Sequence, residues 1–227
     1  MGIRKYSFDE HIFSDYTSIV ECYWAGFIAA DGCITKRSKD TEYNSLTITL
    51  GVKDINHLKA LKKHLRADNK ISTRLMNDGT GNFHKSCEFR VGNREIVKDL
   101  YKNYNITPRK SLTLKPPPSL TKRQFKAFLV GYIDGDGCIG KYKSNRKTKF
   151  YTRLIIIGTE IFLNKILSFI KKEYKQDIKS KVRKKSKCNA YYVKFEGNYI
   201  IPILQNLKAI NVPKLERKWN KVQKIQL

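Results

Sequence analysis

The stretch "LVGYIDGDGCI" occupies residues 129–139, and a closely similar stretch, "WAGFIAADGCI", occupies residues 24–34. Each is an apolar, helix-like run that ends in Asp-Gly-Cys-Ile. One copy alone would suggest a helix closed by a glycine, because glycine readily adopts the left-handed conformation that ends many helices. Two copies in one chain indicate a duplicated structural unit whose shared residues carry a shared chemistry.

The duplication extends well beyond these two stretches, because several anchors lie 105 residues apart. They are Asp31 and Asp136, Gly92-Asn93 and Gly197-Asn198, and Pro108 and Pro213. A single offset that recurs across most of the chain indicates an internal repeat. We therefore divide the chain into a first half, 1–115, and a second half, 116–227, joined by a proline-rich linker near 116–118 that is expected to be extended.

Each half has the pattern helix, two strands, helix, two strands, helix. The first helix of each half, about 18–32 and about 121–137, begins with a candidate capping box, Ser18 to Glu21 and Thr121 to Gln124. The strands alternate: "KSCEFRVG" at 85–92 sets apolar Cys87 and Phe89 against polar side chains on the other face. The sequence thus predicts an α+β fold of two αββαββα halves, each with a sheet that has one apolar and one polar, basic face.

The composition narrows the possible partners. Against 46 basic residues there are only 20 acidic ones, a net charge of +26 in 227 residues. A protein this basic usually binds a polyanion, most often nucleic acid, although a solvated lysine-rich surface is the simpler alternative. The five cysteines have no CxxC spacing, which predicts neither a disulfide framework nor a zinc site and favours a reducing, intracellular compartment. No apolar run is long enough to span a membrane.

Small residues and acids recur together in the two repeated helices. Gly26 and Ala30 in the first helix, and Gly131 and Gly135 in the second, lie four residues apart and so share one helix face. Such faces allow two helices to approach closely.

An acid at the end of each of these two helices is unusual at such a close helix contact. If the helices pack in parallel, Asp31 and Asp136 meet at two helix C-termini, where the helix dipoles add to the repulsion between the carboxylates. A divalent cation would neutralise this arrangement, and carboxylate oxygens suit Mg²⁺, with Mn²⁺ and Ca²⁺ as the other candidates. The alternative is that each aspartate merely caps a turn.

The stretches "LVGYIDGDG" and "WAGFIAADG" resemble the signature of the LAGLIDADG homing endonucleases, in particular the monomeric members with two motifs. The resemblance implies two halves related by a pseudo-twofold axis, motif helices at their interface, and a saddle of antiparallel sheet over the DNA major groove. It also implies that Asp31 and Asp136 bind the metal and that Ala30 and Gly135 offer backbone carbonyls to it.

Two lysines extend the resemblance, and one position differs between the two motifs. Lys110 in "TPRKS" and Lys218 in "LERKW" correspond to basic residues that the family places near the scissile phosphates. The first motif has Ala29 where the second has Asp134, so the two half-sites are expected to be unequal.

The polar faces of the predicted sheets supply the candidate DNA-binding residues. Arginine can grip guanine with two hydrogen bonds, whereas many lysines are expected to contact phosphates only. The candidates are Thr35, Arg37, Ser45, Thr47, Arg74 and Arg90 in the first half and Tyr142, Ser144, Lys181, Arg183, Tyr192 and Lys194 in the second.

The resemblance implies a site-specific endonuclease, intron-encoded or free-standing, that cuts both strands of double-stranded DNA by metal-dependent phosphodiester hydrolysis. With each sheet covering roughly one helical turn, the target is expected to span about 20 base pairs. Two alternatives remain open: a non-cleaving binder such as an intron RNA maturase, and a DNA-binding regulator. The presence of both Asp31 and Asp136 favours the endonuclease, because binding alone does not require paired acids in a basic groove.

Overall fold

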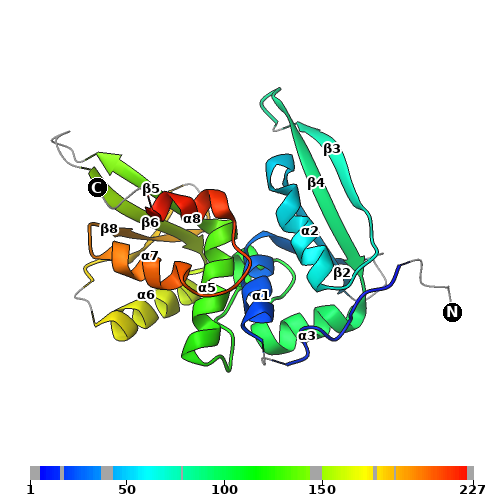
Figure 1. The fold of residues 1–227 in the computed structure, drawn as a ribbon, viewed down its shortest axis with the longest axis horizontal. Helices are drawn as coiled ribbons and strands as arrows, with labels where there is room; N and C mark the ends of the chain where they lie inside the picture. The colour runs from blue at the N-terminus through cyan, green and yellow to red at the C-terminus, as the bar shows by residue number, and fades with distance from the viewer. Residues whose placement is uncertain are drawn as a thin grey trace.

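The computed structural model describes residues 6–15, 18–36, 43–77, 79–143, 150–175, 178–186 and 188–223. Two halves of like architecture lie side by side, with helices α1 (Ile19–Asp31) and α5 (Lys122–Asp136) between them (Figure 1). The predicted α+β fold of two αββαββα halves is confirmed.

Both halves follow the same order of α-helices and strands, and the first half has one additional 3-10 helix. The first continues with β1 (Gly32–Lys36), β2 (Tyr43–Gly51), the 3-10 helix η1 (Val52–Asp54), α2 (Ile55–His64), β3 (Ile71–Asn77), β4 (Phe83–Gly92), α3 (Arg94–Tyr104) and the short α4 (Lys110–Thr113). The second continues with β5 (Gly137–Lys143), β6 (Phe150–Gly158), α6 (Glu160–Tyr174), β7 (Val182–Lys184), β8 (Tyr191–Glu196), α7 (Ile200–Lys208) and α8 (Glu216–Gln223).

The two sheets are antiparallel and share one topology. Their strand orders are β1-β2-β4-β3 and β5-β6-β8-β7. The register of the strands that follow the motif helices also agrees, since Gly32 pairs with Ile48 and Gly137 pairs with Ile156. Equivalent positions in the two halves can therefore be assigned residue by residue along these strands.

Alternation along the strands gives each sheet one apolar and one polar face. Cys87, Phe89 and Val91 of β4 are buried, whereas Arg90 between them is exposed. Helices α2 and α3 pack on the apolar face of the first sheet, and α6 and α7 pack on that of the second (Figure 1). In the parts of the chain that the structure describes, these four helices leave the opposite face of each sheet uncovered, as the alternation predicted.

Helices α1 and α5 pack against each other more closely than side chains would normally allow. A Cβ atom on Gly26 would lie 1.9 Å from the Phe128 carbonyl oxygen, and one on Gly131 would lie 1.9 Å from the Tyr23 carbonyl oxygen. Further along, Gly135 faces Ala30. Because Gly135 and Ala30 each lie next to the C-terminal end of their helix, the helices are parallel, and the predicted role of the small residues is confirmed.

The helix ends agree with the sequence prediction only in part. Thr121 and Gln124 form a complete capping box, but the Ser18 hydroxyl accepts a hydrogen bond from the Val20 amide rather than from Glu21. The left-handed conformation predicted for Gly32 and Gly137 is wrong, because their φ angles are −73° and −98°.

Close backbone approach, rather than a positive φ angle, accounts for these two glycines. A Cβ on Gly32 would lie 2.6 Å from the Ile28 carbonyl oxygen, and one on Gly137 would lie 2.5 Å from the Ile133 carbonyl oxygen. Each glycine also begins a strand directly after its helix. Because the strand follows the helix without a loop, the position of each motif aspartate relative to its sheet is fixed.

Two whole-chain features bear on the composition. All five cysteines are free thiols. Among the described residues, every helix is too short or too polar to cross a membrane.

Candidate functional site

The two motif acids lie at the same end of the helix interface. Asp31 is the last residue of α1 and Asp136 the last residue of α5, and the helices run in parallel. A Cβ on Gly135 would come within 3.2 Å of the Asp31 carboxylate, so the glycine makes room for that group. Burial raises the pKa of Asp31 to about 6, and the charge of Asp136 adds to the effect. Burial also raises the pKa of Asp136.

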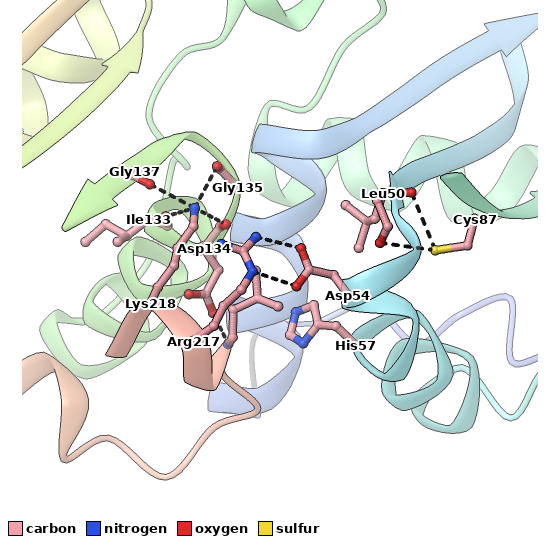
Figure 2. Close-up of polar contacts among 12 residues, drawn as sticks. Leu50, Asp54, His57, Cys87, Ile133, Asp134, Gly135, Gly137, Arg217 and Lys218 are labelled. Carbon is pink, nitrogen blue, oxygen red and sulfur yellow. Dashed lines mark hydrogen bonds and ion pairs between the residues drawn. The ribbon is translucent and has the colours of Figure 1, made fainter. Parts of the chain in front are cut away.

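Two lysines approach these acids from the segments that follow α3 and α7. Lys110, at the start of α4, donates a hydrogen bond to the Ala30 carbonyl. Lys218 of α8 donates to the carbonyls of Gly137 at 2.8 Å and Gly135 at 3.0 Å, and also to those of Ile133 and Asp134 (Figure 2). Burial lowers the pKa of both lysines, although the nearby acids oppose the shift.

The structure therefore brings together the candidate catalytic residues that were predicted from the sequence. Asp31, Asp136, Lys110 and Lys218 surround the C-terminal ends of α1 and α5. The carbonyls of Ala30 and Gly135 are already engaged by lysine ammonium groups. A carbonyl oxygen has two lone pairs, so this contact leaves each of them one position for a second partner.

The protein itself supplies few ligands for a metal. Within the described residues, no group of three or more His, Cys, Asp or Glu side chains is placed to hold a metal ion. The site thus offers two carboxylates, and the remaining ligands must be carbonyls, water or substrate oxygens. This set fits Mg²⁺, which often binds through one or two carboxylates together with waters and substrate phosphates.

Asp134, two residues before Asp136, has a different environment. It is 1% exposed, and its carboxylate accepts hydrogen bonds from the Tyr23 hydroxyl at 2.6 Å, the Trp219 indole at 2.7 Å and the Leu215 amide at 3.0 Å. The Tyr23 hydroxyl also lies 2.9 Å from Nε2 of His57. Asp134 therefore ties α5 to α1 and to the C-terminal segment.

A further contact between the halves was not predicted from the sequence. The Arg217 guanidinium makes two hydrogen bonds of 2.6 Å each to the Asp54 carboxylate, joining α8 to η1 (Figure 2). The Arg217 hydrogen bonds hold the pKa of Asp54 below its usual value. This pair anchors α8, and with it Lys218, at the interface. Sequence patterns carried no signal for it, since 163 residues separate the partners.

The first-half candidates for DNA contact lie on the polar face of their sheet. Thr47 pairs with Arg90 across β2 and β4, and the Arg74 guanidinium lies 2.5 Å from the Glu88 carboxylate. Ser45 is only 2% exposed, and its hydroxyl accepts a hydrogen bond of 2.8 Å from Nε of Arg90. Thr35, on β1, pairs with Ser45. Arg37 lies outside the described residues.

The second-half candidates have a corresponding placement. Lys181, Arg183, Tyr192 and Lys194 line one cavity of about 430 Å³ at β7 and β8. Tyr142, on β5, supports the guanidinium of Arg153, whose Cζ lies 3.7 Å from the ring centroid. Ser144 lies outside the described residues.

Arg153 was not among the residues predicted from the sequence. It precedes the apolar run "LIII", which suggests a strand buried on both faces and hides the alternation that places Arg153 on the polar one.

Comparisons with known proteins place the fold. No family model matches the chain, and no curated protein matches it in sequence. Among solved structures, the meganuclease I-SmaMI bound to uncleaveable DNA is similar over 89% of this chain and 86% of its own, with 13% identity and a TM-score of 0.60. The LAGLIDADG homing endonuclease I-LtrWI bound to target DNA is similar over 91% and 89%, with 15% identity and a TM-score of 0.59.

A third solved structure, the LAGLIDADG homing endonuclease I-GzeII in complex with its DNA target, has 12% identity and a TM-score of 0.59 over 89% of this chain and 88% of its own. The fold is therefore that of the LAGLIDADG homing endonucleases, as the two motifs implied. Here one polypeptide carries both halves of that fold.

Proposed function

We propose that the protein is a site-specific endonuclease that binds double-stranded DNA across its two sheets and cuts both strands with the help of a divalent cation. One observation carries the proposal: two largely buried carboxylates meet at parallel helix ends, between two sheets whose polar faces are not covered by α2, α3, α6 or α7. The DNA-bound state of the three structural neighbours supports the same conclusion.

The sheets account for binding. Each polar face presents arginine, lysine and hydroxyl side chains, which suit the major groove and the adjacent phosphates. Because the two halves repeat one architecture, each would cover about one helical turn, which gives a target of about 20 base pairs. The net charge of +26 supplies the electrostatic attraction.

The helix ends account for the chemistry. Asp31 and Asp136 would hold Mg²⁺ between them, with the DNA phosphates completing its ligands. When bound, the ion polarises the phosphate and activates water. Lys110 and Lys218 hold positive charge beside the acids, where it stabilises the negative charge that develops on the phosphate oxygens.

The proposal is tested by incubating the purified protein with DNA that flanks its own coding locus, with Mg²⁺ or with EDTA. A double-strand break at one position, present only with Mg²⁺, is expected. Tight binding without cleavage in either Mg²⁺ or Mn²⁺ would contradict the proposal and favour a non-cleaving regulator. Preference for intron RNA over the same DNA would favour a maturase.

A further inference from the structure

A cavity of about 830 Å³ lies where helices of the two halves meet. Its walls come from η1 and the start of α2 in the first half, and from the end of α7, the segment 212–215 and α8 in the second. Because α2 and α7 pack on the apolar faces of their sheets, the cavity lies on the side of the sheets that carries the helices. A cavity of this volume has room for a small organic ligand.

The walls of this cavity carry an excess of positive charge. Four of the lining side chains are cationic and two are acidic: Lys53, Lys208, Lys214 and Arg217 against Asp54 and Glu216. The Asp54 carboxylate is already neutralised by its two hydrogen bonds from Arg217 (Figure 2). Three lysines therefore remain against the single carboxylate of Glu216.

Lys208, the last residue of α7, has a buried ammonium group. Within the described residues its Nζ atom has no hydrogen-bond partner, whereas Nζ of Lys214 donates to the carbonyls of Ile210 and Val212. Burial lowers the pKa of Lys214, and the positive charge of Lys208 adds to the effect, although Asp134 opposes it. Two neighbouring ammonium groups thus repel each other, and a buried charge without a partner is unfavourable. An anion between them would relieve both costs.

Two helix N-termini add to the positive potential of the cavity. Asn56 and His57 in the first turn of α2 line it, as do Glu216 and Arg217 in the first turn of α8. Asp54, the N-cap of α2, makes no capping hydrogen bond with its side chain. The N-terminal end of a helix attracts anions, because its backbone amides and the helix dipole present positive charge there.

We propose that this cavity binds the phosphate group of a small molecule, held by Lys208 together with Lys53 and Lys214. Three ammonium groups match a doubly charged phosphate better than a singly charged carboxylate, and the oxygens of one phosphate suffice to accept hydrogen bonds from more than one lysine. The position on the helix side of the sheets favours a small phosphate compound over the backbone of bound DNA. The site goes beyond the proposed endonuclease function and does not depend on it.

The test is isothermal titration calorimetry with inorganic pyrophosphate, in a buffer with EDTA so that no metal ion holds the anion at Asp31 and Asp136. The wild-type protein is expected to show saturable binding. Lys208→Met should raise the Kd about 10-fold or more, because it removes a charge-assisted hydrogen bond. Lys165→Met is the matched control, since it removes the same charge from an exposed position on α6 outside the cavity and should leave the Kd unchanged.

Thermal melting separates a ligand site from a structural role for Lys208. Without phosphate, Lys208→Met should melt at the same temperature as the wild type or higher, because it removes a buried charge that has no partner. Pyrophosphate should raise the melting temperature of the wild type and of Lys165→Met, but not that of Lys208→Met. A Lys208→Met protein that melts lower than the wild type and still gains stability from pyrophosphate would overturn the proposal.

A short DNA duplex distinguishes the two sources of phosphate. The duplex should bind the wild type and Lys208→Met equally, and it should not displace pyrophosphate. Weaker duplex binding by Lys208→Met, or displacement of pyrophosphate by the duplex, would overturn the assignment to a small molecule. Equal affinity of the wild type, Lys208→Met and Lys165→Met for pyrophosphate would show only adventitious binding to a basic protein, and it would overturn the proposal, as would the absence of binding.

Discussion

At the scale of single residues, two aspartates on one helix have different roles because their neighbours differ. Asp134 is 1% exposed and accepts hydrogen bonds from three protein donors, whereas Asp136, which accepts a hydrogen bond from Tyr132, faces a second acid and two ammonium groups. A carboxylate that is fully satisfied by protein donors serves structure. One that is held against a like charge is a candidate for binding a cation.

His57 makes the Asp134 network sensitive to pH. Burial lowers the pKa of His57 to about 4, compared with about 6.5 in the unfolded chain. Between these values the unfolded chain binds the extra proton and the folded chain does not, so stability is lost as pH falls from 6.5 to 4. The loss is expected to reach at most about 3 kcal/mol.

The measurement is urea unfolding across that pH range for the wild type, His57→Gln and His84→Gln. Glutamine can still bond Tyr23 but does not titrate, so His57→Gln should flatten the dependence. The exposed His84 is the control and should leave it unchanged. Equal slopes for the wild type and His57→Gln would show that His57 does not titrate as described.

Lys110 and Lys218 should also differ in their effect on stability. The Lys218 ammonium, which has three N–H donors, is shared among four carbonyls near the end of α5, whereas Lys110 donates to one at the end of α1. Lys218→Met should therefore cost about 1–3 kcal/mol of unfolding free energy, because it leaves buried acceptors unpaired. Lys110→Met should cost less. Chemical denaturation at pH 7.5 compares them, and an equal or larger decrease in stability for Lys110→Met would contradict this prediction.

At the scale of secondary-structure elements, the α1–α5 contact determines the position of the site. The predicted face of small residues is present, and it lets the two helix ends carry their acids to one place. A helix interface this close has no space for an additional methyl group.

Gly131→Ala tests that contact. Its Cβ would lie 1.9 Å from the Tyr23 carbonyl oxygen, so the helices must separate, at a cost of about 1–3 kcal/mol or more. Gly140→Ala is the matched control, since it adds the same methyl group in open space and should change the melting temperature little. A Gly131→Ala protein as stable as the wild type would show that the helices do not approach so closely.

The elements also show which features were predictable from sequence. Periodicity and the 105-residue repeat predicted the order of helices and strands, because these follow from local patterns of burial. The extended conformation of Gly32 was not predictable, since it arises from contact with Ile28 in the folded turn. The Arg217–Asp54 pair and the exposure of Arg153 depend on how distant strands and helices meet, for which a single sequence carries no periodic signal.

At the scale of the whole molecule, charge is distributed unevenly between the halves. Residues 1–115 hold 20 basic and 13 acidic residues, a net charge of +7, whereas residues 116–227 hold 26 and 7, a net charge of +19. The second half should therefore supply more of the salt-sensitive binding to DNA phosphates.

Charge-neutralising variants test this asymmetry. Replacing Lys181, Lys184 and Lys185 with glutamine should reduce the slope of log Kd against log salt concentration by up to about 3, since each phosphate that a lysine neutralises adds about 0.9 to that slope. The matched variant replaces Lys36, Lys70 and Lys85 of the first half and should reduce the slope less. A larger reduction from the first-half variant would show that the charge imbalance has no role in binding.

The proposed function of the whole molecule depends on Asp31 and Asp136 acting as the paired acids of a double-strand cut. The most direct measurement is cleavage of a cognate site in a supercoiled plasmid, with strand-specific end labels, by Asp31→Asn, Asp136→Asn and the double variant. Asparagine keeps the size of aspartate but removes its charge, so all three proteins should still bind DNA. Each single variant is expected to lose double-strand cleavage and at most nick one strand slowly, and the double variant should not cut. Full double-strand cleavage by either single variant would contradict the central claim and return that aspartate to a helix-capping role.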